Sequence, residues 1–449
     1  MGRPEDVLMA GDGLLKRLGL DRPDLRAWAL YDWANSAFQT TIIAAVFPIY
    51  YAEVAARGLP PPVATSRFMW ATAIAILIVA IVAPILGAVA DYRAVKKGML
   101  AAFLVIGVAA TAAMYFIGPG DWPLALQLFV AGNVGVAGTI VFYESLLPHL
   151  VPPGDDAALD RVSSAGYAIG YLGGGVLLAI NVLMITKPSL LGIPDVGTAT
   201  RLTFVSVAIW WAVFSIPLFV RVPEPLVVGM GGPSSLAHTI RAAFARLGTT
   251  FRELRRYRQA FLLLLAFLIY NDGIQTMIRA ATIYGTEIGL NTTLMIAALL
   301  LTQFIGVPCA FMFGRLAGRI GPKRAVFIGL LVYAFITILG YFMRTGAHFL
   351  ALAILVGTVQ GGTQALSRSM FASMIPRDRS SEFFAFFSVF ERYAGVLGPV
   401  LFAWMISVSG RGRNAILAVL AFFVIGAAIL SFVDLEAGRR EATRPTVRT

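Results

Sequence analysis

WALYDWANSAFQTTIIAAVFPIYY, from Trp28 to Tyr51, is the first long apolar stretch of the chain and predicts a membrane-spanning helix. At about 1.5 Å per residue, its length crosses a hydrocarbon core of about 30 Å with some tilt. A carboxylate within such a helix costs about 2.5–3.5 kcal/mol on insertion scales unless it faces protein or water. Two interpretations of Asp32 follow: it pairs with a neighbour near the cytoplasmic end, or it forms with Asn35 and Gln39 a polar stripe along an aqueous path, which we favour.

The composition is that of a membrane protein. Hydrophobic residues make up 58% of the 449 residues and charged residues 13%, and the mean hydropathy is +0.79, well above that of a soluble globular chain. The net charge of +12 comes from 36 Lys and Arg against 24 Asp and Glu. Most of the basic residues fall in segments on one side of the predicted spans, so the positive-inside rule explains the excess and places both termini in the cytoplasm. The charge therefore requires no nucleic-acid partner.

Hydropathy predicts an all-α membrane protein with twelve transmembrane helices in two pseudo-symmetric six-helix halves. The expected spans are 28–51, 68–90, 98–118, 122–147, 162–185, 202–220, 260–284, 292–314, 325–343, 348–374, 383–408 and 412–433. The expected segments are a cytoplasmic tail (1–27), an N-terminal half (28–220), a cytoplasmic linker (221–259), a C-terminal half (260–433) and a second cytoplasmic tail (434–449). The linker contains a basic amphipathic pattern over Leu236–Gln259, which predicts a helix on the inner membrane surface.

The sequence carries no pattern of a metal site, a disulfide or an enzyme. Cys309 is the single cysteine, and the three histidines are scattered without ligand spacing. Neither a phosphate-binding loop nor a His-Glu-x-x-His pattern is present. We expect no cofactor and no enzymatic activity. Because the first 23 residues are polar, we also expect no cleavable signal peptide.

Two short loops six spans apart indicate that the halves are related. Each loop has a Gly, three further residues and then a basic turn. The two loops are GAVADYRAVKK (Gly87–Lys97) and GRLAGRIGPKR (Gly314–Arg324). They resemble the paired signature loops of the major facilitator superfamily. This resemblance implies that Asp91, with Arg93 in the same loop, serves in gating by holding the N-terminus of the eleventh helix, near Ser380–Glu382, in one alternating state.

Longer stretches resemble one family within that superfamily, the vacuolar effluxers. This family comprises the autophagy-related amino-acid exporters of fungal vacuoles and their bacterial relatives, and the resemblance covers nearly the whole chain. It implies a secondary transporter. The stretches are YDWANSAF (Tyr31–Phe38), FYESLLP (Phe142–Pro148), SSAGYAIGYLGGG (Ser163–Gly175), YNDG (Tyr270–Gly273) and GGTQALSRS (Gly361–Ser369).

Several ionisable residues besides Asp32 fall within predicted spans and suggest mutual pairing, since an unpaired charge in hydrocarbon is costly. With Asp32, most of them lie in the cytoplasmic half of the membrane, which predicts an ion-pair layer that gates the inward side, for example Glu144 or Asp32 with Arg368. Static contacts between helices are the alternative. The expected gating residues are Glu144, Arg368, Glu391, Arg392, Asp91 and Arg93.

Asp272 and Arg279 lie deeper in the seventh span. We expect Asp272, or else Asp32, to take up a proton. Arg279 either clamps a substrate carboxylate or pairs with Glu287 or with backbone carbonyls. The residues expected to line the substrate cavity are Tyr31, Asp32, Asn35, Gln39, Tyr143, Tyr270, Asn271, Asp272, Gln275, Arg279 and Gln364.

The glycines of the fifth span predict close helix packing, because Gly166, Gly170 and Gly174 recur every four residues and share a face.

The sequence as a whole predicts a secondary active transporter that moves a small organic solute by alternating access. We expect amino acids as the solute, export as the direction and proton coupling in the manner of an antiporter. The location expected is the inner (cytoplasmic) membrane of a bacterium, with the chain acting as a monomer in the lipid bilayer. The alternative is a membrane sensor or lipid-handling protein that has the same fold but transports nothing.

Overall fold

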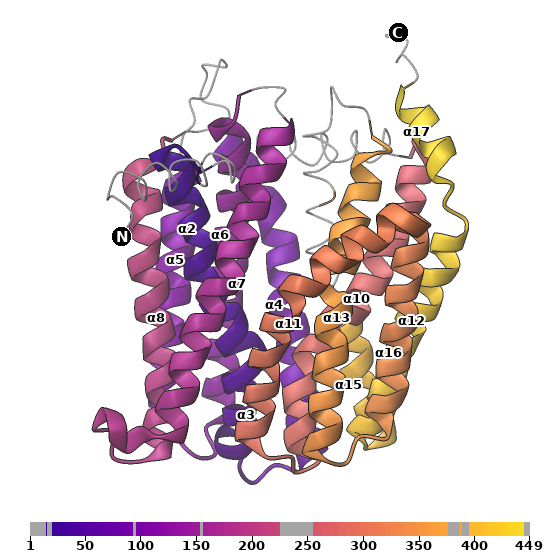
Figure 1. Cartoon of the computed structure of the whole chain (residues 1–449). Coiled ribbons are helices and arrows are strands. Elements are labelled where there is room, and N and C mark those ends of the chain that lie inside the picture. The colour runs from indigo at the N-terminus through magenta and orange to yellow at the C-terminus, as the bar shows by residue number, and fades with distance from the viewer. Residues whose placement is uncertain are drawn as a thin grey trace, which may run out of the picture. The chain divides into compact units, whose positions relative to one another are not determined.

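The computed structural model describes residues 15, 20–92, 96–152, 156–224, 255–375, 387 and 395–443. Every regular element among these residues is helical (Figure 1). Ten helical segments are long and apolar enough to cross a membrane, and shorter apolar helices, Thr292–Gly306 and Leu397–Ser409, stand where the eighth and eleventh spans were predicted. The prediction of an all-α membrane protein is confirmed for this part of the chain.

The helices follow the chain in the order of the predicted spans. The elements up to the linker are α2 (Pro23–Ala37), η1 (Phe38–Ala45), α3 (Val46–Tyr50), η2 (Tyr51–Ala55), α4 (Pro61–Tyr92), α5 (Lys96–Ala113), η3 (Met114–Phe116), α6 (Trp122–Leu150), α7 (Asp156–Thr186), η4 (Pro188–Leu191) and α8 (Val196–Arg221). Those after it are α10 (Arg258–Glu287), α11 (Thr292–Ile320), α12 (Pro322–Tyr341), α13 (Gly346–Ala372), α15 (Leu397–Ser409), α16 (Gly412–Ser431) and α17 (Leu435–Thr443).

The first membrane helix is not uniform along its length. It starts as the α-helix α2 with a proline in its first turn, as is common at helix starts. It then widens into π-helical turns at η1 and η2, on either side of the short α3. Pro48 lies in α3, and a proline has no N–H to donate to the carbonyl four residues earlier. The Ala44 carbonyl therefore lacks the donor that a regular α-helix would give it.

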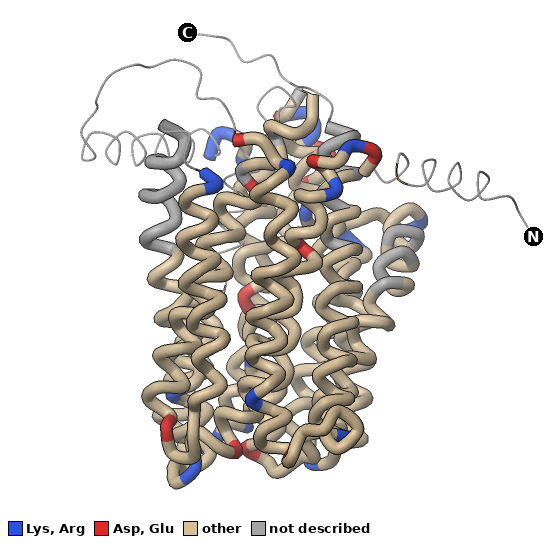
Figure 2. The backbone as a smooth tube through the Cα atoms, turned by 90° about the vertical axis from the view of Figure 1, so that its left-hand side faces the viewer, with Lys and Arg blue, Asp and Glu red and all other residues tan. Residues whose placement is uncertain are grey.

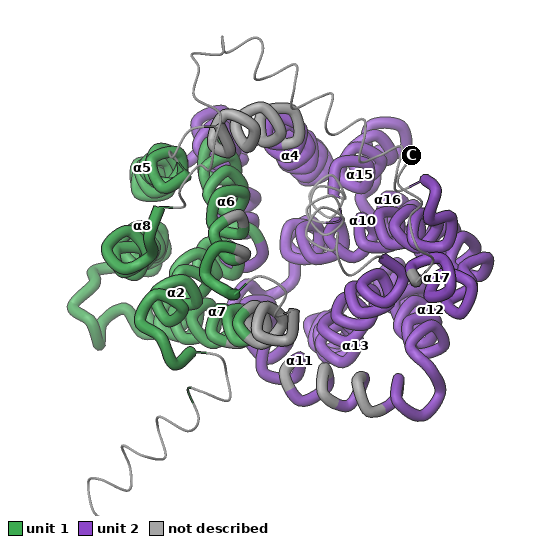
Figure 3. The backbone as a smooth tube through the Cα atoms, turned by 90° about the horizontal axis from the view of Figure 1, so that it is seen from above, with its two compact units in different colours: residues 1–43, 82–117, 131–240 green, residues 44–81, 118–130, 241–449 purple. Residues whose placement is uncertain are grey.

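By internal contacts the chain divides into two compact units, coloured separately in Figure 3. Unit 1 comprises residues 1–43, 82–117 and 131–240, and unit 2 comprises residues 44–81, 118–130 and 241–449. In unit 1, α2 packs on α7 and α8, and the core includes Trp28, Tyr31, Phe142 and Tyr143. In unit 2, α10 packs on α16, and α13 packs on α11 and α12.

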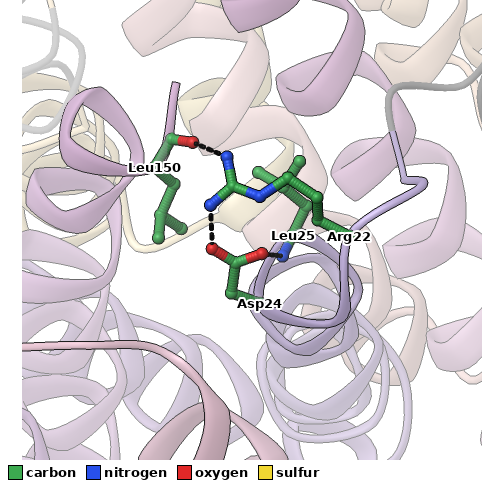
Figure 4. Close-up of polar contacts among 4 residues, drawn as sticks. All are labelled: Arg22, Asp24, Leu25 and Leu150. Carbon is green, nitrogen blue, oxygen red and sulfur yellow. Dashed lines mark hydrogen bonds and ion pairs between the residues drawn. The ribbon is translucent and has the colours of Figure 1, made fainter. Parts of the chain in front are cut away.

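Charged residues gather near the helix ends and are sparse along the middle of the helices (Figure 2). Several of the cations at the ends cap the carbonyl terminus of another helix, where the helix dipole favours positive charge. Arg22 Nη1 donates to the carbonyl of Leu150, the last residue of α6, at 3.0 Å, while its other terminal nitrogen meets Asp24 (Figure 4). The start of α2 is thereby tied to the end of α6.

The two units share a lysine contact that supports an internal repeat. In unit 1, Lys97 Nζ donates to the Phe219 and Val222 carbonyls at the end of α8, each at 2.7 Å. In unit 2, Lys323 Nζ donates to the Ser431 and Val433 carbonyls at the end of α16, at 2.9 and 2.6 Å. Each lysine comes from one of the two loops whose sequences match. The paired loops therefore make matching contacts in the two units.

Candidate functional site

In unit 1, the carboxylate of Asp32 is held by two side chains. Tyr143 donates its hydroxyl to Oδ2 at 2.9 Å, and Asn35 donates Nδ2 to Oδ1 at 3.3 Å. The Tyr143 ring stacks on Trp28, with ring centroids 4.5 Å apart. Trp28 in turn donates its indole N–H to the Tyr143 carbonyl at 3.1 Å. A phenol and an amide therefore solvate a half-buried acid, and the phenol is itself held in place by an aromatic stack.

The prediction of close packing by the glycines of the fifth span is confirmed. On α7, a Cβ atom at Gly166 would lie 2.7 Å from Asp32 Oδ2, and one at Gly170 would lie 2.8 Å from Ser36 Oγ. At Gly174 it would lie 2.9 Å from the Thr40 side chain. All three glycines face the first membrane helix, and the first of them gives the Asp32 carboxylate its room.

In unit 2, the carboxylate of Asp272 is held differently, at the N-terminus of a helix. Its Oδ1 accepts the backbone N–H of Gly398 at 3.0 Å, in the first turn of α15, and the hydroxyl of Thr276 at 3.4 Å. Asp272 is only 1% exposed. The N-terminus of a helix carries unpaired N–H groups and a positive dipole end, so an anion is stable there.

The sequence at the start of α15 explains this arrangement. Gly395 adopts φ +113°, a backbone conformation that residues other than glycine rarely adopt. The helix α15 starts two residues later. A Cβ atom at Gly398 would overlap Thr276 Oγ1 and lie 2.7 Å from Asp272 Oδ1. The helix begins within the predicted eleventh span, and only glycine at 398 leaves room for the carboxylate.

Beside Asp272, two polar pairs join α10 to α13. Gln364 donates its amide to Asn271 Oδ1 at 3.2 Å, and the hydroxyls of Tyr270 and Ser367 are hydrogen-bonded to each other. Asn271 is fully buried, yet its Nδ2 has no hydrogen-bond partner among the described residues. That amide N–H is available to a bound molecule.

Arg279 lies seven residues after Asp272 on α10, which places the two on the same face, two turns apart. Its Nε and Nη1 are buried without a hydrogen-bond partner in the described part of the chain. Glu287, one of the partners considered for it, accepts the N–H of Gly412 instead, at 3.0 Å. Two donors of a guanidinium fork, which is suited to carboxylates, are therefore uncommitted.

The remaining predicted site residues fall into three groups. Glu144 lies on α6 in unit 1, close enough to Asp32 for their charges to interact, and the half-buried Gln39 lies in η1. Gln275 and Arg368 lie in unit 2, on α10 and α13, both half-buried. Pairing of Arg368 with Glu144 or Asp32 joins residues of different units and stays a prediction. The side chain of Asp91 and the residues Arg93, Glu391, Arg392, 236–254 and 380–382 lie outside the described part of the structure.

Three residues at these sites did not follow from the sequence: Gly398, Thr276 and Ser367. Thr276 is one turn after Asp272, and this spacing was a usable signal. Ser367 is three residues after Gln364, which also places it near the predicted face of α13. Gly398 is 126 residues from Asp272, and nothing in the local pattern connects the two positions.

Comparison with known proteins gives a consistent family. Residues 63–443 match the model of the family described as vacuole effluxer Atg22 like. YxiO of Bacillus subtilis, an MFS-type transporter, is 36% identical over 412 residues, covering 91% of this chain and 94% of that protein. Autophagy-related protein 22-1 of Phaeosphaeria nodorum is 26% identical over 446 residues, covering 85% of this chain and 78% of that protein.

Solved structures of low sequence identity share the fold. A bacterial homologue of the human lysosomal transporter Spinster, in an inward-facing conformation, superposes with a TM-score of 0.64 at 17% identity, covering 94% of this chain and 98% of that one. A D-xylose-proton symporter gives a TM-score of 0.66 at 16% identity, covering 93% and 98%. The fold is the twelve-helix fold of the major facilitator superfamily, and the chain belongs to the Atg22-like vacuole effluxer family and is a transporter, not an enzyme.

Proposed function

We propose that this transporter exports amino acids, or small solutes that share their carboxylate and ammonium groups, in exchange for protons. One feature of α10 carries the proposal. The uncommitted guanidinium nitrogens of Arg279 lie on the same helix face as the buried carboxylate of Asp272. Arg279, which can bind a carboxylate, and Asp272, which can bind a proton, thus lie two turns apart.

The neighbouring polar groups support the same solute class. The Nδ2 of Asn271 is a second buried donor without a described partner, and Gln364 fixes the orientation of that amide. Solute sites in such proteins are largely apolar, with a few placed polar groups that set orientation. An amino acid would present its carboxylate to Arg279 and Asn271.

Asp272 supports proton coupling through its contact with α15. As a carboxylate it accepts the N–H of Gly398 and interacts with the positive end of the helix dipole. Protonation removes the charge that makes this contact strong. A proton bound at Asp272 would therefore loosen the start of α15, which provides a route from protonation to a change of conformation.

The proposal places the protein in the inner (cytoplasmic) membrane of a bacterium, acting as a monomer with both termini in the cytoplasm. The bacterial relative at 36% identity supports the location.

Flux measurements in proteoliposomes test the function. Purified protein is reconstituted with a panel of labelled amino acids inside, and efflux is followed with and without an inward proton gradient. We expect a subset of the panel to leave faster when the gradient is imposed, and liposomes with Arg279→Gln to lose that flux. Folded wild-type protein that moves no amino acid, with or without the gradient, would refute the amino-acid assignment.

A further inference from the structure

A second acid of α10, Glu287, lies far from Asp272 and contacts the start of another helix, α16. Glu287 is the last residue of α10, and its Oε1 accepts the N–H of Gly412, the first residue of α16, at 3.0 Å. A Cβ atom at position 412 would lie 2.6 Å from Oε1 and closer still to Oε2. As at Gly398, a glycine leaves room for a carboxylate at a helix N-terminus.

The Glu287 carboxylate also contacts a segment from the first part of the chain. The Thr65 side chain of α4 lies close enough to this carboxylate to interact with it, while its hydroxyl donates to the Pro61 carbonyl at 3.1 Å. The next residue, Ser66, donates its hydroxyl to the Ala403 carbonyl of α15 at 3.3 Å. The start of α4 is thus connected to the end of α10 and to α15, all within unit 2.

Two further contacts join early and late segments at this end of unit 2. Thr282 donates its hydroxyl to the carbonyl of Ala44, four residues before Pro48, at 2.8 Å. Thr292, in the first turn of α11, donates its hydroxyl to Glu53 of η2. Each contact links a residue before position 67 to one after position 281.

We propose that Glu287 is the positioning residue of an outer gate. This gate is defined as the contacts of Glu287 with Gly412 and Thr65, of Ser66 with Ala403, of Thr282 with Ala44, and of Thr292 with Glu53. The predicted topology places this end of the helices on the outer face of the membrane. A transporter that works by alternating access must break such contacts to admit or release solute on that side. Within this set, Glu287 is the residue whose carboxylate accepts a backbone N–H at the N-terminus of a helix. Hydrogen bonds to a carboxylate are strong. The proposal depends on the transporter fold alone and on neither the solute nor the coupling ion.

Cysteine accessibility in intact cells tests the gate. The native Cys309 is replaced by serine, and Gln275→Cys is introduced on α10 as the reporter, twelve residues or about 18 Å along the helix from Glu287. A membrane-impermeant maleimide then reaches the reporter from the outer side when the gate is open. We expect Glu287→Gln to raise the labelling rate at least threefold.

A matched control separates gating from helix capping. Asp195 caps α8 by accepting the Thr198 N–H at 2.9 Å and lies in a loop predicted on the same side. Within the described residues it makes no hydrogen bond to another membrane helix, and it is exposed. Asp195→Asn therefore removes a capping charge without opening the proposed gate, and we expect the labelling rate to stay within error of the parent.

A second variant attacks the same contact from the opposite side. Gly412→Ala puts a methyl group against the carboxylate at a helix position where alanine is otherwise favourable. It should raise labelling as Glu287→Gln does, and the double variant should exceed neither single variant by more than error. Size-exclusion profiles matching the parent confirm folding. Labelling that stays at the parental rate in both folded single variants would overturn the proposal.

Discussion

The acids of the first and seventh membrane helices, Asp32 and Asp272, are held in different ways. Asp32 in unit 1 contacts two side chains, through the Tyr143 hydroxyl and the Asn35 amide. Asp272 in unit 2 contacts the backbone of α15 at Gly398. A change of charge at Asp32 therefore acts first on two side chains, whereas a change at Asp272 acts directly on the backbone of a helix. An acid in the first helix of each half therefore does not imply the same role in both.

The largest effect that distinguishes the acids should come from the glycines that face them. Gly398→Ala would overlap Thr276 and crowd Asp272, whereas Gly166→Ala would bring a methyl group 2.7 Å from Asp32 Oδ2 and 3.1 Å from the Trp28 ring. Overpacking costs about 1–3 kcal/mol, and we expect Gly398→Ala at or above the upper end and Gly166→Ala near the lower end. Thermal unfolding in detergent measures both. A fall in Tm at Gly166→Ala equal to that at Gly398→Ala would contradict the expected difference in crowding between the two positions.

The next effect concerns the tyrosines beside each acid. Tyr143→Phe removes the hydroxyl that donates to Asp32 and keeps the stack on Trp28, so it should destabilise the fold by about 1.5–3 kcal/mol, the range for a hydrogen bond to a charged group. Tyr270→Phe loses only its contact with the Ser367 hydroxyl, at about 1 kcal/mol. Denaturant titration of both variants gives the ordering. Equal costs would mean that the hydrogen bond to Asp32 is no stronger than one between two neutral hydroxyls.

The lysine contacts sharpen the comparison from the other direction, because here the two units agree. Lys97→Met and Lys323→Met keep the aliphatic stem and lose two hydrogen bonds each to carbonyls at a helix end. We expect each to cost about 1–2 kcal/mol and the two costs to match. Unfolding midpoints of the two variants, measured side by side, check this. A loss confined to one unit would argue against equivalent roles for the paired loops.

The smallest effect concerns two exposed helix caps, Asp195 before α8 and Asp434 before α17. Hydrogen bonds from the Thr198 hydroxyl and backbone lower the pKa of Asp195, and backbone N–H groups of residues 436 and 437 lower the pKa of Asp434. A pKa lowered by folding adds stability above the unfolded value, about 3.9, and this stability is lost as the pH falls through the folded value. The difference in Tm between the wild type and Asp195→Ala should be small, full at pH 6, and shrinking below pH 3.9. A difference that grows as the pH falls would reverse the sign.

Much of the fold follows from hydropathy alone, because a span of about 20 apolar residues has few other stable states in a membrane. The packing face of Gly166, Gly170 and Gly174 also followed from spacing, since residues four apart share one side of a helix. The acids Asp32 on α2 and Asp272 on α10 could be singled out from sequence because such residues are costly in lipid.

The partners of the two acids did not follow from sequence, since they depend on contacts between distant segments. Tyr143 is 111 residues from Asp32, and Gly398 is 126 residues from Asp272. The start of α15 within a span depends on the backbone at Gly395 and on packing against α10, and an apolar sequence does not encode it locally. Only the tertiary structure distinguishes an acid held by side chains from one held by a helix.

The most direct test of proton coupling at Asp272 compares two variants in proteoliposomes, Asp272→Asn and Asp32→Asn. Efflux driven by a proton gradient and counterflow at equal pH are measured on the same preparations. Asparagine keeps the shape of each side chain and removes the ionisable group. We predict that Asp272→Asn loses at least tenfold in gradient-driven efflux and keeps counterflow, while Asp32→Asn retains a response to the gradient. Full gradient-driven efflux by folded Asp272→Asn would contradict the account, since the proton would then act elsewhere than at the start of α15.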